Sequence, residues 1–581
     1  MSKHIIWLVP LLIVGTAFSA SAAGDGEAGA DIVYEYDVAA TNMHRRNPEL
    51  NMTKRWLDEY FNIRINWVVT ENQFEKLNVL LAAGEVPDMI AMRLNPVQLA
   101  TYADQGVLAE LPVATIREMM PEYYAHVESF GDPRVWKYGE IGGKHMGLPI
   151  ISPWNVYRRG IAWNAQWLYN VGITKVPETL EEFEAAFMKF RHEDPNRSGS
   201  KDTYAFTAPG DQETAPAGFF QEIFGAHGTF AFQWIEKDGE LQYGFTDPGT
   251  KEALALLADW YAREIIDPEW VTEIGRKDGA NDVSWKFANE KIGYVSSLGS
   301  DDSEWDGGGH LNRKWHTAHP EHRSYIYTDP DCWPDDCSGK GHYSIIAFTE
   351  IDPAAHADVT DYHPYINAEP PIGPRGDAGM SVRGLQPLYV AFGRPLEKDQ
   401  ARYGRMLEVL NSIATDRELY YSAALGCFVG DPTEVCQEAT PWHWIPWDGS
   451  EYGNYFGQTD EWLADPRRQG ELGQNLAGGF STNPFWVYAP WYNVSRGAGG
   501  VQRQMLYDAI ASQNTVEQPL KVALPSQAEY ADVDKVLKEF FYKVILGTQS
   551  VDDYDDVVAE WRRNGGDVLT REANEWFATV Q

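Results

Sequence analysis

Residues 71–93 constrain the fold more than any other stretch of this chain. Their apolar residues recur at the spacing of one helix face up to Ala83. Gly84 then favours a left-handed stop, and Pro87 keeps the helix from resuming. We therefore predict a helix that ends at Ala83 or Gly84. Its apolar face consists of Phe74, Leu77, Leu80 and Leu81.

The short run that follows this helix predicts a buried strand. Residues 89–92, Met-Ile-Ala-Met, are apolar without alternation, which is typical of a strand covered on both faces of a parallel sheet. Residues 32–36 and the alternating residues 63–69 predict two earlier strands, with an amphipathic helix over 51–61 between them. The order strand, helix, strand, helix, strand predicts an α/β fold with a parallel sheet and right-handed crossovers.

Length and charge narrow the class of protein. The 581 residues exceed what one hydrophobic core usually supports, so we expect two lobes or more. The 85 acidic residues outnumber the 48 basic ones and give a formal charge of −37, which makes nucleic acid and anionic membrane surfaces poor partners. The 22 Trp residues suit a core, and they also suit a pocket whose rings stack on sugar faces.

The first 22 residues predict export. Lys3 precedes an apolar run over 5–18, and small residues follow up to Ala22. This pattern is typical of a signal peptide over 1–22 that is cleaved after Ala22. The alternative is a membrane anchor, but the run is too short to span a bilayer. No Cys lies near the cleavage site, so we expect a periplasmic protein without a lipid anchor.

Four cysteines form two close pairs in this exported chain. Of the three possible connectivities we favour two local disulfides, Cys332 with Cys337 and Cys427 with Cys436. The alternative is a zinc site that combines the first pair with nearby histidines, although the spacing matches no ligand pattern. These histidines are His310, His316, His319 and His322.

The stretch Lys-Leu-Asn-Val-Leu-Leu-Ala-Ala-Gly-Glu-Val-Pro-Asp-Met-Ile over 76–90 resembles the helix, turn and strand near the N-terminus of family 1 extracellular solute-binding proteins of ABC importers. The similarity is to their large oligosaccharide-binding branch. Within it, Thr179 and Glu182 form a capping box that predicts a helix through Phe190. The similarity covers most of residues 60–577, with gaps. Its further landmarks are 164–168, 176–183, 244–254, 260–270, 286–294, 371–377 and 540–561.

The resemblance implies a two-lobed periplasmic-binding-protein fold, type II-like, with the ligand cleft between the lobes. We expect the N-terminal lobe over 31–152 and 370–425, and the C-terminal lobe over 153–369 and 426–581. Two regions depart from the family pattern and indicate insertions. They lie near 300–347 and 427–492.

The candidate ligand-binding residues combine flat rings with planar hydrogen-bonding groups, as capture of a sugar requires. They follow strand one, follow the strand over 89–92, lie at the crossover between lobes, or belong to the Trp-rich insertion. Each also has a plainer interpretation as core packing or as a solvated side chain. They are Asn42, His44, Arg45, Arg93, Trp154, Asn155, Trp442, Trp444 and Trp447.

No enzyme motif stands out, and we expect a binding protein with no catalytic residues. A phosphate-binding loop, a His-Glu-x-x-His helix and a Gly-x-Ser-x-Gly elbow are all missing from the sequence. We expect a monomer that delivers an oligosaccharide or other small molecule to the membrane permease subunits of an ABC importer. A secreted glycosidase or lyase acting on polysaccharide is the alternative, and a peptide-binding relative is a third reading.

Residues 194–203 predict a structural calcium ion. Counted from Asp194, oxygens fall at positions one, three and five, glycine at six, a backbone carbonyl at seven and Asp202 at nine, as in most of an EF-hand loop. The segment also resembles the calcium loop of alginate-oligosaccharide-binding members, but Thr203 stands where they have an acid. The alternative is a polar turn without an ion. The candidate ligands are Asp194, Asn196, Ser198, Ser200, Asp202 and Thr203.

Overall fold

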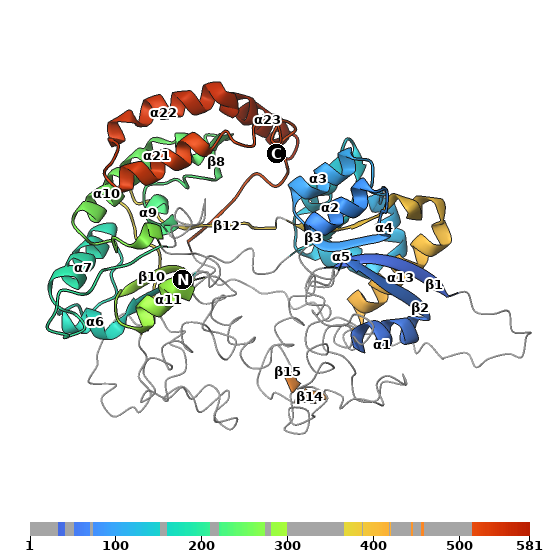
Figure 1. The fold of residues 1–581 in the computed structure, drawn as a ribbon, viewed down its shortest axis with the longest axis horizontal. Coiled ribbons are helices and arrows are strands. Elements are labelled where there is room, and N and C mark those ends of the chain that lie inside the picture. The colour runs from blue at the N-terminus through green and yellow to red at the C-terminus, as the bar shows by residue number, and fades with distance from the viewer. Residues whose placement is uncertain are drawn as a thin grey trace, which may run out of the picture.

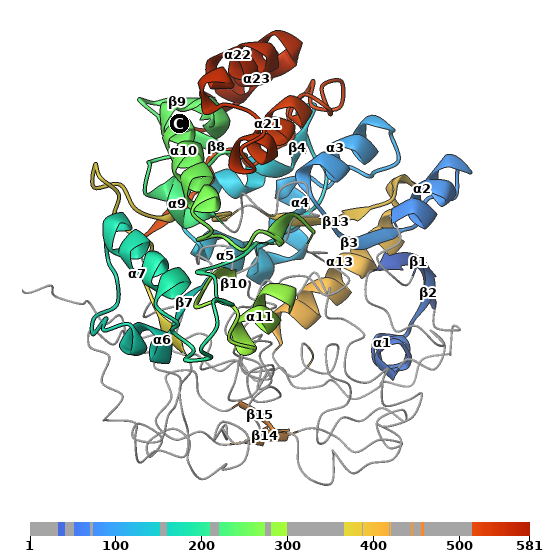
Figure 2. The same ribbon diagram turned by 60° about the vertical axis from the view of Figure 1, so that its left-hand side comes forward.

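The structure is a computed structural model, and the fold is built from the residues that it describes. These are 33–40, 52–69, 74–151, 160–208, 220–272, 281–298, 365–385, 387–416, 419, 443–445, 455–457 and 514–581. They form two lobes, each with helices around its own sheet, and Figure 1 shows the lobes side by side with strand β12 (Met380–Val382) running between them. Figure 2 shows the same structure turned by 60°. None of the described helices has the length and apolar character that a membrane crossing requires.

Lobe one contains a five-stranded sheet in the order β2-β1-β3-β13-β6. Strand β1 pairs in parallel with both β2 and β3, as the sequence predicts, whereas the returning strand β13 is antiparallel to β3 and β6. The elements are β1 (Tyr34–Ala40), α1 (Met52–Phe61), β2 (Ile63–Val69), α2 (Phe74–Ala82), β3 (Met89–Leu94), α3 (Pro96–Asp104), α4 (Val113–Met119), α5 (Pro121–Ser129), η2 (Pro133–Gly139), β4 (Glu140–Ile141), β5 (Lys144–His145), β6 (Leu148–Ile150), β13 (Leu388–Phe392), η10 (Arg394–Lys398) and α13 (Gln400–Thr415).

Strand β3 lies inside this lobe, covered on both faces. Met89 and Ala91 belong to the core under α1, α4, α5 and α13, while Ile90 and Met92 belong to the core under α2 and α3. This double coverage confirms the interpretation of the apolar run as a buried parallel strand. Gly84 has φ +82°, so the helix before β3 does stop through a left-handed glycine.

A buried carboxylate joins the start of β3 to α13. The Oδ2 atom of Asp88 accepts a hydrogen bond of 2.9 Å from the Asp37 backbone N–H, and its Oδ1 atom pairs with the Arg402 guanidinium. Burial raises the pKa of Asp88, and the hydrogen bond from Asp37 and the nearby arginine oppose that shift. Residues 37, 88 and 402 are thus tied together although they are far apart in sequence.

Lobe two surrounds a smaller sheet in the order β10-β7-β11. The segment 204–208 extends it, because Tyr204 bridges Ile292 in parallel and Phe206 bridges Ile266. The elements are β7 (Gly160–Asn164), α6 (Ala165–Asn170), α7 (Leu180–His192), α9 (Gln221–Gly225), β8 (Trp234–Lys237), β9 (Glu240–Tyr243), η4 (Gly244–Thr246), α10 (Pro248–Ala262), η5 (Trp270–Thr272), α11 (Asn281–Ala288), β10 (Tyr294–Leu298), β11 (Tyr365–Asn367), α21 (Lys535–Ile545), η13 (Val551–Asp553), α22 (Tyr554–Trp561), the π-helical turn η14 (Arg562–Gly566) and α23 (Asp567–Phe577).

Local sequence signals explain how the helices of lobe two begin. The Thr179 side chain accepts the Glu182 N–H, and the Glu182 carboxylate accepts the Thr179 N–H. This capping box confirms the predicted start of α7, which ends at His192. Asp247 caps α10 in a similar way, with Pro248 at the first helical position.

Two neighbouring strands connect the lobes. Strand β12 pairs in parallel with β16 (Thr515–Glu517). Met380 belongs to the core of lobe two, whereas Leu385 and Val522, which follow these strands, pack against the core of lobe one. The chain therefore passes from lobe two toward lobe one twice, along two paired strands.

Helix α9 lies directly against the segment that returns toward lobe one. A Cβ atom on Gly225 would overlap the Gly379 carbonyl, and one on Gly373 would overlap the Ala226 carbonyl. The backbones can approach this closely only because both positions lack a side chain.

The same helix carries a carboxyl group into the core of lobe two. Glu222 has no exposed surface, and its Oε1 atom accepts a hydrogen bond of 2.9 Å from the Tyr294 hydroxyl. The Tyr294 ring packs against Trp163 and Phe187. Burial raises the pKa of Glu222 from 4.5 to about 7, and the hydrogen bonds from Tyr294 and Ser296 oppose that shift.

We predict that Gly225→Ala destabilises the protein, because the new methyl group must displace the Gly379 backbone. Overpacking of this kind costs roughly 1–3 kcal/mol of unfolding free energy. The control is Gly404→Ala in α13, where the nearest other atom would lie 3.5 Å away, an ordinary contact. That variant should gain roughly 0.5–1 kcal/mol. Urea unfolding measures both, and a Gly225→Ala variant as stable as Gly404→Ala would contradict the contact.

We further predict that Glu222 lowers stability as the pH rises. Between pH 4.5 and about 7 the native carboxyl keeps its proton while the unfolded one loses it, so the free energy of unfolding falls across this window and is level above it. The full loss is roughly 3 kcal/mol. Glu222→Gln keeps an acceptor for Tyr294 and should remove the loss, whereas Glu560→Gln on the surface of α22 should not. Parallel pH profiles for wild type and Glu222→Gln would refute this assignment.

Candidate functional site

The segment between β6 and β7 connects two sheet edges, and at each of these edges parallel strands have their carboxyl ends. Strands β1, β3 and β6 end at one edge of the sheet in lobe one. In lobe two, the segment 204–208 and β10 end at the edge where β7 begins. Only residues 151–159 separate β6 from β7, and these span at most about 30 Å. Because ligands bind at such edges in open α/β sheets, the two edges define the candidate site.

Most of the predicted ligand-binding residues belong to loops at these edges and lie outside the described residues. Asn42, His44 and Arg45 follow β1, and Trp154 and Asn155 belong to the crossing between β6 and β7. Their assignment to the site stays a prediction. The four cysteines, Cys332, Cys337, Cys427 and Cys436, also lie outside the described part of the chain.

Arg93 is the predicted ligand-binding residue that the structure describes in full. It occupies the penultimate position of β3, half-buried, between the buried residues Met92 and Leu94. Its φ of 55° is unusual for a residue other than glycine. Strained backbone at a strand's carboxyl end is common at ligand sites, which favours Arg93 as a contact residue.

The Trp-rich segment enters the described structure only as a short hairpin. Strand β14 (His443–Ile445) pairs antiparallel with β15 (Tyr455–Gly457), and Trp444 lies opposite Phe456. The backbone at Trp444 is thus extended. Trp442 and Trp447 lie outside the described residues.

The predicted calcium loop folds around its own carboxylates. Asp194 accepts the N–H groups of Ser198 and Gly199 at 2.9 and 3.0 Å. The Oδ1 atom of Asp202 accepts the Ser198 hydroxyl at 2.9 Å. Asp194, Arg197 and Gly199 all have positive φ, which turns the loop sharply. Side-chain oxygens of Asp194, Asn196, Ser198 and Asp202, with the Ser200 carbonyl beside the Ser198 hydroxyl, are therefore brought close together.

This donor set fits a hard cation such as calcium, which prefers oxygen ligands. Thr203 is a weaker candidate than the other five, because its hydroxyl is buried and donates to the Phe190 carbonyl at 2.7 Å. Within the described residues, no group of three or more His, Cys, Asp or Glu side chains is placed to hold a metal. The loop offers only two carboxylates, and its other oxygens belong to amide, hydroxyl and carbonyl groups.

Sequence reasoning missed the charged residues at the connection between the lobes. Lys521 is buried, and its ammonium donates to the Arg383 carbonyl at 2.6 Å and pairs with Glu517 at 2.6 Å. Burial lowers the pKa of Lys521. Glu517 and Lys521 are four residues apart, but Arg383 lies 138 residues before Lys521, and no motif marks the three.

The C-terminal helix also contacts lobe one beside this connection. Trp576 packs against the cores of both lobes, with its ring centroid 6.1 Å from that of Tyr138. The Tyr138 hydroxyl donates to Asp132, which forms a bidentate pair with Arg134. Trp576 thus joins the two lobes at this point.

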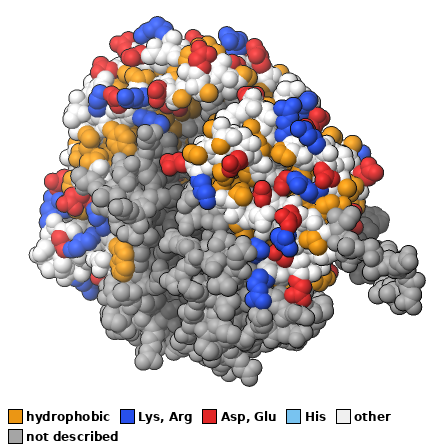
Figure 3. Space-filling view, turned by 45° about the vertical axis from the view of Figure 1, so that its right-hand side comes forward, with side chains coloured by type: hydrophobic (Ala, Val, Ile, Leu, Met, Phe, Trp, Pro, Cys, Tyr) orange, Lys and Arg blue, Asp and Glu red, His pale blue; other side chains and the backbone are white. Residues whose placement is uncertain are grey.

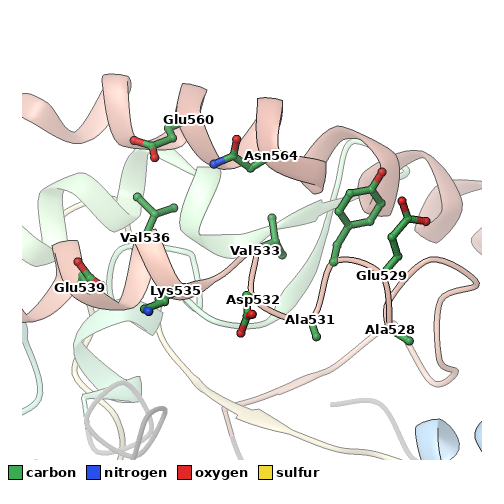
Figure 4. A pocket seen from close by; sticks show the side chains of 11 residues that line it. Ala528, Glu529, Ala531, Asp532, Val533, Lys535, Val536, Glu539, Glu560 and Asn564 are labelled. Carbon is green, nitrogen blue, oxygen red and sulfur yellow. The ribbon is translucent and has the colours of Figure 1, made fainter.

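A separate pocket of about 530 Å³ lies among the C-terminal helices of lobe two (Figure 4). Its charged residues are mostly acidic, with Lys535 among them. Residues 528–539, Glu560 of α22 and Asn564 of η14 form it, so it does not belong to the sheet edges. Its lining residues are Ala528, Glu529, Tyr530, Ala531, Asp532, Val533, Lys535, Val536, Glu539, Glu560 and Asn564.

Acidic and basic side chains are mixed on the face of the molecule that Figure 3 shows. On the face in Figure 3, acidic and basic side chains are interspersed over the described parts of both lobes. Several form exposed ion pairs, such as Arg64 with Glu35 and Lys251 with Asp555. Isolated exposed pairs of this kind stabilise a fold little.

Comparison of the sequence with known families and proteins gives a consistent result. Residues 52–338 match the family model described as bacterial extracellular solute-binding protein. Lipoprotein LipO of Bacillus subtilis is 24% identical over 230 residues, and the polygalacturonan/rhamnogalacturonan-binding protein YtcQ of Bacillus subtilis is 24% identical over 263. These matches cover 39% and 43% of this chain and only 42% and 50% of the two relatives.

The fold has many close counterparts among solved structures. An extracellular solute-binding protein from Bifidobacterium longum subsp. infantis superposes with a TM-score of 0.63 at 14% identity, over 95% of this chain and all of that one. The Streptococcus pneumoniae substrate-binding protein FusA in complex with kestose gives 0.60 at 14%, over 95% and 99%. Alginate-binding protein AlgQ2 without calcium ion gives 0.55 at 13%, over 94% and 98%. Residues 52–338, a little under half of the chain, are thus similar to the bacterial extracellular solute-binding proteins, and nearly the whole chain shares its fold with the solved structures named above.

Proposed function

We propose that this protein is the periplasmic solute-binding subunit of an ABC importer and that it captures an oligosaccharide between its two lobes. The observation that carries the proposal is the pair of sheet edges joined by residues 151–159, in a chain that matches the solute-binding family. YtcQ is named for binding polygalacturonan and rhamnogalacturonan, and FusA was solved with kestose. These relatives support a carbohydrate as the ligand.

Closure of the lobes supplies the mechanism. A ligand that touches both sheet edges binds the closed form more tightly than the open form, so it shifts the population toward closure. Bending is expected where the lobes are joined, along β12 and β16. Membrane permease subunits would then recognise the closed, loaded protein. Nothing in this mechanism requires a reaction, and a monomer suffices.

The binding site itself is proposed at the strand ends. Arg93 offers a planar, charged hydrogen-bond donor at the end of β3. We propose that Asn42, His44, Arg45 and Asn155 add polar groups, while Trp154 and the rings of Trp442, Trp444 and Trp447 stack on sugar faces.

Export and processing follow from the same proposal. We propose cleavage after Ala22, release into the periplasm without a lipid anchor, and oxidation of the two cysteine pairs. LipO carries the name lipoprotein, whereas this sequence has no Cys before Cys332. For the lobes we keep the predicted boundaries, 31–152 with 370–425 and 153–369 with 426–581.

We also propose a structural calcium ion in the loop 194–203 of lobe two. Asp194, Asn196, Ser198, Ser200 and Asp202 would hold it, and when bound it would stiffen the loop between α7 and residues 204–208. Two of the similar structures are AlgQ2 solved without calcium ion and an EF-hand mutant of FusA, which supports the proposal. With two carboxylates the affinity should be modest, at roughly 0.1–1 mM.

We predict that an oligosaccharide will co-purify with the native protein and be identified by mass spectrometry, and that it will bind again in calorimetry after removal. Trp154→Ala should weaken binding by roughly 1–3 kcal/mol because a stacking ring is lost. The control Tyr169→Ala, on the exposed surface of α6, should bind as wild type does. Unchanged affinity of Trp154→Ala would remove that ring from the site. Shortening of the oligosaccharide during incubation would favour the glycosidase or lyase instead.

We predict that millimolar calcium raises the thermal midpoint relative to a chelator. Binding at ten times the dissociation constant adds about 1.4 kcal/mol, which corresponds to roughly 1–3 °C for a protein of this size. Asp194→Asn should lose the effect because it removes one of the two carboxylates. Differential scanning calorimetry makes the measurement, and an identical midpoint of the wild type in calcium and in chelator would exclude the ion.

A further inference from the structure

The second carboxylate of the proposed calcium loop already has a positive partner. The Lys291 ammonium lies 2.7 Å from the Oδ2 atom of Asp202, in an ion pair whose two side chains are 49% and 34% exposed. The Oδ1 atom of Asp202 accepts the Ser198 hydroxyl at 2.9 Å and the Asn196 amide at 3.4 Å. Both oxygens of Asp202 are therefore occupied by donors from the protein.

Other cations beside the loop have a different partner. Arg191 and Lys201 both pair with Glu264, at 2.7 and 3.3 Å. Arg191 also donates to the Thr203 carbonyl at 3.1 Å. Lys291 thus differs from these two neighbours in facing a carboxylate of the loop itself.

Lys291 is held in place by the sheet rather than by its side chain. Its carbonyl accepts the Tyr204 N–H at 2.9 Å, and the next residue, Ile292, bridges Tyr204. Asn196 of the loop donates to the Glu290 carbonyl at 3.3 Å. These backbone contacts keep position 291 beside the loop even when the side chain moves away.

We propose that the Lys291 ammonium and calcium compete for Asp202, so that lysine supplies the positive charge of the loop when no ion is bound. A divalent ion ligated by Asp202 must displace the ammonium and remains close to it, and like charges at such distances repel. The inference rests on the proposed calcium site. The Lys291 ammonium would let a loop with two carboxylates keep its shape at low calcium. It would also lower the affinity of the loop for calcium.

The test uses the full-length protein with Lys291→Gln, which removes the charge and keeps a donor. The control is Lys543→Gln on α21, where Lys543 is equally exposed and pairs with Glu539 at 3.3 Å. Calorimetric titration with calcium chloride gives the dissociation constants, and thermal unfolding in chelator gives the stability of the ion-free loop. A third variant, Asp202→Asn, removes the shared carboxylate.

We expect Lys291→Gln to bind calcium on the order of tenfold more tightly than wild type. It should unfold at a lower temperature than wild type in chelator, and calcium should restore it. Lys543→Gln should match wild type in calcium affinity. Asp202→Asn should bind calcium weakly, both alone and combined with Lys291→Gln.

Two results would overturn the inference, and they are distinguishable. If wild type and Lys291→Gln bind calcium with equal affinity, Lys291 does not compete, while the calcium site itself survives. If neither binds calcium up to about 10 mM, well above the range of weak extracellular sites, the calcium site and the competition both fail.

Discussion

The parallel pairing of β12 with β16 is the constraint on which the arrangement of this protein depends. Each lobe has its own core, and among the described residues the lobes are joined by the paired strands between them and by contacts beside those strands. Lys521 ties the second strand to the carbonyl of Arg383 just after the first. A buried ammonium without such acceptors would be costly, which makes this connection specific in its geometry.

In lobe two, the connecting segment packs closely against the backbone of helix α9. Gly225 and Gly379 bring α9 against the returning chain at a distance that no side chain would allow. The contact with lobe one is of a different kind, because there the ring of Trp576 packs against the ring of Tyr138. Close backbone packing on one side and a ring contact on the other would suit the lobe closure that we propose.

Buried charges follow one rule in both lobes. Asp88 is compensated by Arg402 and a backbone N–H, whereas Glu222 has hydroxyl and backbone donors, and burial raises its pKa to about 7. The difference is the presence of a cation beside the first carboxyl group. The half-buried Asp202 differs from both, because the side chain of Lys291, which is itself partly exposed, neutralises it.

Short-range patterns predicted much of lobe one and parts of lobe two. The strand over 63–69, the glycine stop after α2 and the capping box of α7 all appear as predicted. Strand β1 differs, since it begins at Tyr34 and continues to Ala40 rather than ending at residue 36. Its last residues have little strand propensity, but Ala39 and Ala40 pair with β3, so the partner strand decides the length.

The sequence by itself determined the elements whose signals lie within a few residues of one another, namely helix faces, caps, stops and the oxygen spacing of the loop 194–203. Only the tertiary structure decided which polar and charged groups contact one another. These contacts are Asp88 with Arg402, Lys521 with the Arg383 carbonyl, Asp202 with Lys291, and Glu222 with Tyr294. The reason is physical. Caps and periodicity act between neighbours along the chain. These pairs, in contrast, are brought together by the packing of whole elements. Nothing in the local sequence distinguishes their members from the many other polar and charged residues of the chain.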